Sequence, residues 1–157
     1  MTDTALRSHL VKLLDWKEAH ATFDAAVDGV PLKMRGAVPR RWEYSIWQLV
    51  EHVRIAQADI LDFCVNAKYE HTMKWPDDYW PKARAPKTSA AWARALADYH
   101  RDLEAMKSLA RETPDLGAAI PHGTGQTYLR EVLLVTDHTA YHVGQIVALR
   151  RQLGIWK

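Results

Sequence analysis

Four stretches of helical hydrophobic periodicity, separated by segments that contain proline and glycine, constrain the fold of this chain most strongly. Apolar residues recur at helical spacing within residues 4–28, 46–63, 88–113 and 126–153. No stretch shows the alternation of a half-buried strand, and the sequence has no internal repeat. Because each amphipathic helix must bury its apolar face against another element, the pattern predicts an all-α protein, a four-helix bundle.

Capping residues mark the ends of three of these helices. Ser45 followed by Gln48 is a capping-box signature, so the second helix is expected to begin there. Thr88 or Ser89 is expected to start the third helix. The fourth helix runs without an internal proline to Gly154, a residue suited to the left-handed conformation that closes many helices.

The remaining segments carry weaker signals. The first helix is expected to be continuous over residues 4–28, with His20 on its apolar stripe. We expect His20 to be a hydrogen-bonded core histidine, with a role in a pocket as the alternative. Residues 69–87 contain three prolines and an aromatic group that includes Trp75 and Trp80. A connection of this length is often functional, so it is interpreted as either a hydrophobic clasp or a substrate lid.

Size and charge limit the classes of protein to which the chain can belong. With 157 residues it is expected to form a single domain spanning residues 1–157. Its 21 basic and 19 acidic residues are interspersed and form no basic helix, which argues against nucleic acid as a partner. The single cysteine, Cys64, fits a reducing compartment, and no stretch resembles a signal peptide or membrane span. We therefore expect a cytoplasmic protein with no membrane partner.

Two histidines in the last helix suggest a metal site. His138 and His142 are four residues apart, which places their imidazoles on one helical face with Cβ atoms roughly 6 Å apart. Gln145 falls on the same face one turn later, although the helix should be apolar where it is buried. A metal ion would satisfy these polar groups, whereas a polar surface stripe explains the same pattern without any ligand.

A third ligand would have to come from another helix, because two neutral imidazoles rarely complete a stable site. His52 lies at the border of the apolar stripe of the second helix and can face the bundle interior. From its position alone, it is equally well interpreted as a core histidine bonded to a carbonyl. Cys64 lies about 120° around the helix from His52 and is expected to be a small core residue instead.

The same segments resemble the DinB-like superfamily of metal-dependent enzymes. The resemblance rests on WQLVEH at residues 47–52, DHTAYHVGQI at 137–146 and RRQLG at 150–154, and it covers nearly the whole chain. In that family one histidine of the second helix and an H-x-x-x-H pair of the last helix bind zinc or nickel. The resemblance therefore implies that His52, His138 and His142 hold one divalent transition-metal ion.

The resemblance also implies a choice of functions. Family members include thiol transferases that use bacillithiol, mycothiol or glutathione, and proteins described as hydrolases. Three neutral ligands leave the ion's charge uncompensated and a coordination position open, which suits catalysis. We expect a transferase that uses a low-molecular-weight thiol, because the sequence offers no internal nucleophile and no obvious general base. A metal-dependent hydrolase and a non-catalytic metal- or ligand-binding stress-response module remain alternatives.

Other side chains are expected around the ion, and the protein is expected to have partners. The pocket around the ion is expected to include Gln145, Tyr141 and Gln48, while no catalytic residue can be named. The expected partner is a small-molecule substrate. Family members are often dimers, so a homodimer is also expected, with exposed tryptophans suited to its interface.

Overall fold

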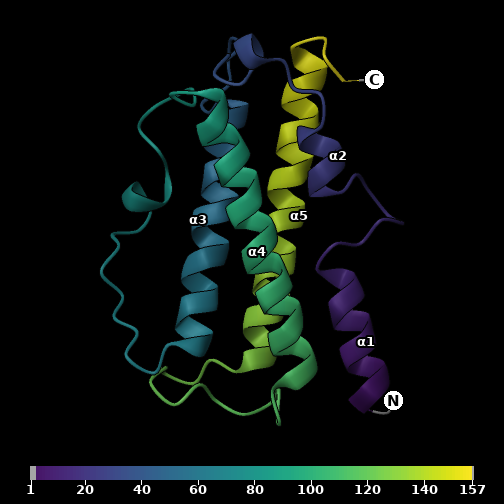
Figure 1. The fold of residues 1–157 in the computed structure, drawn as a ribbon, viewed down its shortest axis with the longest axis vertical. Helices are drawn as coiled ribbons and strands as arrows, with labels where there is room; N and C mark the ends of the chain where they lie inside the picture. The colour runs from purple at the N-terminus through teal and green to yellow at the C-terminus, as the bar shows by residue number, and fades with distance from the viewer. Residues whose placement is uncertain (1–2, 157) are drawn as a thin grey trace.

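The structure, a computed structural model, describes residues 3–156 and is built from α-helices and short 3-10 turns (Figure 1). Within that range there is no strand, only one isolated bridge between Ala119 and Thr127. The predicted all-α class is thus confirmed. The elements are α1 (Asp3–Leu13), α2 (Phe23–Val27), η1 (Leu32–Met34), α3 (Ile46–Val65), η2 (Asp77–Tyr79), α4 (Ser89–Glu112) and α5 (Tyr128–Gln152).

The three longest helices form the centre of the bundle. In Figure 1, α3 and α4 run in the same direction, and α1 and α5 run in the opposite direction. The α3 helix packs against both α4 and α5. The segment 66–88 returns along the outside of α3 from its end to the start of α4 (Figure 1). This segment is therefore placed to cover side chains that project from α3.

The predicted caps are confirmed by hydrogen bonds. The hydroxyl of Ser45 accepts from the backbone N–H of Gln48, and the Gln48 carboxamide oxygen accepts from the backbone N–H of Ser45. Thr88 caps α4 through the backbone N–H of Ala91. Gly154 has a φ of 69°, the left-handed conformation expected after α5.

The prediction of one continuous first helix is wrong. Helix α1 ends at Leu13, and a second short helix, α2, begins only at Phe23, capped by Thr22. Leu14 and Phe23 are both buried, yet nine residues of helix would turn through roughly 900° and place them on opposite faces. A straight helix cannot bury both side chains in one core, so the chain leaves the helix between them.

The same break removes His20 from the core. His20 is exposed and lies in the segment between α1 and α2, where its Nδ1 is 2.8 Å from the carbonyl oxygen of Ala21. The expectation of a buried, hydrogen-bonded histidine on the apolar stripe is therefore wrong, because the stripe on which it was placed does not continue past Leu14.

One continuous apolar core joins α1 to α5. Its completely enclosed side chains come mainly from α3, α4 and α5, and they include Ile46, Val50, Val53, Met106, Val132, Ile146 and Leu149. Helix α5 therefore faces the core with one side and carries His138 and His142 on another side. In the described part of the chain, no helix combines the length and apolar character needed to cross a membrane.

Candidate metal centre

Helices α3 and α5 bring together the three histidines that the sequence analysis selected. His52 is only 2% exposed and His142 is also buried, although both are polar. The Nε2 atoms of His52 and His138 are 3.0 Å apart, and one nitrogen of each of the three rings lies within 4.8 Å of the others. Among the described residues, these three histidines form the one group of metal-binding side chains that lie close enough to share an ion.

Two of the rings are oriented by hydrogen bonds through Nδ1. His52 Nδ1 is 3.0 Å from the backbone oxygen of Tyr79, and His142 Nδ1 is 2.7 Å from the carboxamide oxygen of Gln145. Both partners only accept, so each Nδ1 carries the proton and donates. The Nε2 atoms of these rings are thereby left as lone-pair donors, an arrangement that commonly orients ligand histidines.

The surroundings keep the imidazoles uncharged. Burial lowers the pKa of His52 to about 4, although its hydrogen bond to Tyr79 raises it. Burial and the two neighbouring rings lower the pKa of His138 to about 3. Burial also lowers the pKa of His142. At neutral pH the three rings are neutral, which is the form that binds a metal ion.

The segment 66–88 covers the His52 side of the group. Trp80 stacks on His52 with ring centroids 3.8 Å apart and an interplanar angle of 5°. The ring of the exposed residue Trp75 lies 6.4 Å from that of His52. The aromatic segment thus acts as the predicted clasp, and its contact partner is the histidine group. Whether the segment also serves as a substrate lid stays a prediction.

One carboxylate fastens this clasp to α3. Asp59 accepts a hydrogen bond from the hydroxyl of Tyr79 and, at 2.9 Å, another from the hydroxyl of Tyr69. Tyr79 therefore links two contacts, since its hydroxyl is held by Asp59 while its backbone oxygen orients His52. Both oxygens of Asp59 are occupied, so this carboxylate is a positioning group and is not free to act as a base.

Two further acidic residues, Glu51 of α3 and Glu131 of α5, are also paired. Glu51 binds Arg54 through both carboxylate oxygens, at 2.8 and 3.1 Å. Glu131 is buried and pairs with Arg130. None of the hydrogen bonds that the described residues make to the three imidazoles comes from a carboxylate.

The three predicted pocket residues occupy different positions. Gln145 contacts His142 directly, and the exposed ring of Tyr141 lies 4.9 Å from the ring of His142, edge to face. Gln48 lies one turn before His52 on α3, and its carboxamide NH2 donates to the backbone oxygen of Pro81 while its oxygen caps the helix. Whether these three residues contact a ligand stays a prediction.

Cys64 is confirmed as a core residue outside the histidine group. It is 5% exposed, and burial, followed by the charge of Glu131, raises the pKa of its thiol to about 12. A thiol with this pKa is almost entirely protonated at neutral pH and is a poor nucleophile. The chain therefore has no cysteine of its own to act at the site.

Tyr79 and Trp80 are the site residues that the sequence analysis did not assign. Their motif, WPDDYWP at residues 75–81, was visible as an aromatic cluster between prolines. Helical periodicity carries no information about such a segment. One feature of the sequence indicated this contact. About 27 residues separate His52 from the cluster, and a connection of that length can fold back against the helix that carries His52.

A helical bundle in which α3 and α5 direct three neutral imidazoles at one point defines the class, the DinB-like proteins with a metal site. The chain belongs to the mycothiol-S-transferase family within that class, since the family model matches residues 9–154. The matched range includes all three histidines and the clasp. The chain has no match among curated proteins or among solved structures.

Replacing Gln145 by alanine is expected to weaken metal binding without abolishing it. The change removes the acceptor that orients His142, and loss of such a partner typically costs about 10- to 100-fold in affinity. Competition with a chromogenic chelator measures the dissociation constant, and elemental analysis at saturation measures the stoichiometry. Loss of stoichiometric metal at saturation would instead identify Gln145 as a ligand.

Proposed function

We propose that this protein is a metal-dependent transferase that joins a low-molecular-weight thiol, mycothiol by family, to an electrophilic carbon. The observation that carries the proposal is the convergence of three neutral imidazoles from α3 and α5 in a chain that belongs to the mycothiol-S-transferase family. His52, His138 and His142 are the proposed ligands of one divalent ion, zinc or nickel. Imidazole nitrogen suits both metals.

The residues present fit such an ion. Each ring is neutral, and the Nδ1 atoms of His52 and His142 are already committed to other acceptors, so Nε2 remains for coordination. When bound, the ion would supply positive charge that lowers the pKa of a thiol and so provides the nucleophilic thiolate at neutral pH. The protein's contribution is to fix three nitrogens and to cover the ring of His52 with that of Trp80.

The reaction needs no dedicated base. The sulfur–hydrogen bond breaks, a sulfur–carbon bond forms, and the bond from carbon to the leaving group breaks with its electron pair. The thiol proton passes to solvent, which agrees with the observation that no carboxylate among the described residues hydrogen-bonds to the three imidazoles. Hydrolysis more often uses a general base to manage its proton transfers, so the same observation favours transfer over the hydrolase alternative.

The proposal includes three further properties of the protein. A continuous core from α1 to α5 supports a single domain over residues 1–157. A cytoplasmic location fits the free, buried thiol of Cys64. Exposed Trp75 and Tyr141, which lie near the histidines, suit either an incoming small molecule or a second copy in a homodimer.

Metal-loaded protein is expected to conjugate mycothiol to a chromogenic electrophile such as a dinitrohalobenzene. We expect the rate with zinc or nickel to exceed that of His138→Ala by roughly a hundredfold or more, since the positive charge at the site is lost with the ion. Absorbance of the conjugate gives the rate, and glutathione and bacillithiol serve as comparison thiols.

Three outcomes are distinguishable in the same assay. Metal-dependent conjugation supports the transferase. Turnover of ester or amide substrates without acceleration by any thiol would establish the hydrolase alternative. A protein that binds metal and a thiol but transforms neither substrate class would be a binding module.

A further inference from the structure

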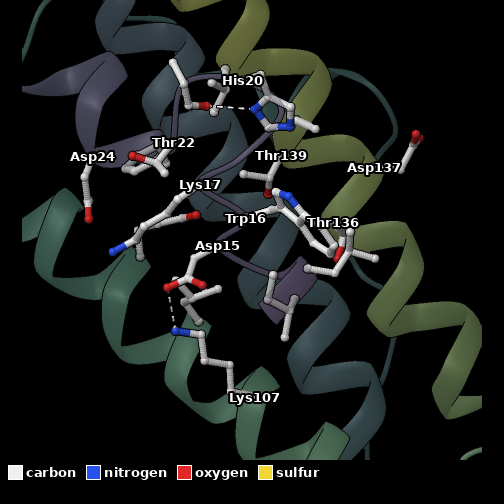
Figure 2. A pocket seen from close by; sticks show the side chains of 18 of the residues that line it. Asp15, Trp16, Lys17, His20, Thr22, Asp24, Lys107, Thr136, Asp137 and Thr139 are labelled. Atoms are coloured by element: carbon white, nitrogen blue, oxygen red, sulfur yellow. Dashed lines mark hydrogen bonds and ion pairs between the residues drawn. The ribbon is translucent and has the colours of Figure 1, made fainter. Parts of the chain in front are cut away.

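A hollow lies away from the three histidines, between the segment that joins α1 to α2 and the helices α4 and α5 (Figure 2). It has a volume of about 670 Å³, within the range of small-molecule sites. Its lining includes Thr136, Thr139, Ala140 and Val143 of α5 but none of the three histidines. Along a helix, residues 136, 140 and 143 lie roughly opposite residues 138 and 142, so the two sites use different faces of α5.

The break in the first helix creates this hollow. Where a continuous helix would lie against α4 and α5, residues 14–22 are not helical and arch away from the bundle. The floor beneath them is apolar and well packed, with the rings of Phe23 and Tyr99 stacked 3.8 Å apart. A ligand with an apolar body would therefore occupy the space that the side chains of a continuous first helix would fill.

The side chain of Trp16 also lines the hollow. Figure 2 shows Trp16 projecting from the connecting segment toward α5, on the side of Thr136 and Thr139. Trp16 is only half-buried, and no ring in the described residues stacks on its indole. The face of an indole ring attracts both aromatic and cationic groups.

The charges at the rim are predominantly negative. Four carboxylates and two ammonium groups line the hollow. Lys107, with 10% side-chain exposure, is held by Asp15 at 3.0 Å and by Glu104 at 2.7 Å, so two carboxylates share one cation. Asp137 is exposed and has no ion-pair partner among the described residues. The imbalance favours a positively charged ligand.

We propose that this hollow is a second binding site, which takes a small organic cation with an apolar or aromatic body. The body lies between Trp16 and the Phe23–Tyr99 floor, and the ammonium faces the rim carboxylates. The site requires no metal ion. Its ligand is independent of the three-histidine site, because the hollow and the histidines lie on different faces of α5.

A matched pair of probes tests the proposal, 1-naphthylmethylammonium and 1-naphthalenesulfonate, which share a ring system and differ in charge. Titrations followed by calorimetry and by ¹H–¹⁵N NMR spectra are expected to show saturable binding of the ammonium, with shifts at Trp16 and Thr139. The sulfonate is expected to bind about tenfold more weakly, because it meets like charge at the rim. Equal or tighter binding of the sulfonate contradicts the proposal, as does the absence of saturable ammonium binding.

Four variants locate the site. Thr136→Trp fills the hollow and should abolish binding, and Asp137→Lys should weaken the ammonium about fivefold through the change of an exposed rim charge. Glu112→Lys reverses an exposed charge on α4 outside the hollow and should have no effect. His138→Ala should bind the ammonium like the unaltered protein. Unchanged affinity in both Thr136→Trp and Asp137→Lys, or loss of binding in His138→Ala, would place the probe elsewhere and overturn the assignment.

Discussion

Replacing His138 by alanine is expected to remove nearly all bound metal from the protein. The variant keeps two of the three converging nitrogens, and each ligand of a tight site contributes on the order of a third of a binding free energy of roughly 12 kcal/mol. We therefore expect the dissociation constant to rise at least about a thousandfold. Elemental analysis of untagged protein, supported by chelator competition, measures both stoichiometry and affinity.

His9→Ala is the matched control for this variant. His9 is an exposed histidine on α1 that lies outside the histidine group, so its loss should leave the metal content unchanged. Because an ion that binds only the folded state stabilises it, a chelator should lower the melting temperature of the unaltered protein and of His9→Ala but not of His138→Ala. Equal metal content in the two variants would show that the site is misassigned.

The metal-free protein is expected to lose stability steeply as the pH falls below about 6.5, the ordinary pKa of histidine. In the unfolded chain His52 and His138 take up protons near that pH. In the folded protein, burial holds their pKa values at about 4 and about 3. Between these limits the unfolded state binds more protons, so the free energy of unfolding decreases with decreasing pH.

We expect the free energy of unfolding to fall by about 3 kcal/mol between pH 7 and pH 4. This is roughly half of the value that the two pKa shifts would give if the site did not relax when a proton binds. Urea titrations in the presence of a chelator measure the free energy of unfolding at each pH. His138→Ala should show a shallower dependence, because one of the two depressed groups is gone. The idea fails if the two proteins show the same pH dependence.

The elements of the site with a regular helical signal could be predicted from the sequence. Ser45 and Gln48 identified the start of α3, and the four-residue spacing of His138 and His142 placed both on one face of α5. His52 could be placed at the border of an apolar stripe, but only the family resemblance distinguished it from a core histidine. The structure adds the convergence of the rings, which depends on how α3 and α5 pack.

Two features were not predicted, for different physical reasons. The break after Leu13 follows from a change in the phase of the apolar stripe between Leu14 and Phe23, which a search for helical spacing alone does not register. The stacking of Trp80 on His52 depends on a non-helical segment whose path is decided by tertiary contacts with Asp59. Local sequence patterns do not encode such a path.

The separation of the proposed ligands along the chain has a mechanical consequence. His52 and His138 are 86 residues apart, and the intervening chain contains the whole of α4. An ion bound by both would act as a cross-link that closes this loop, and closing a covalent loop of that length restricts an unfolded chain by on the order of 4 kcal/mol. Coordination that persisted during partial opening would keep α3 tethered to α5 and favour the return of α4 to its place.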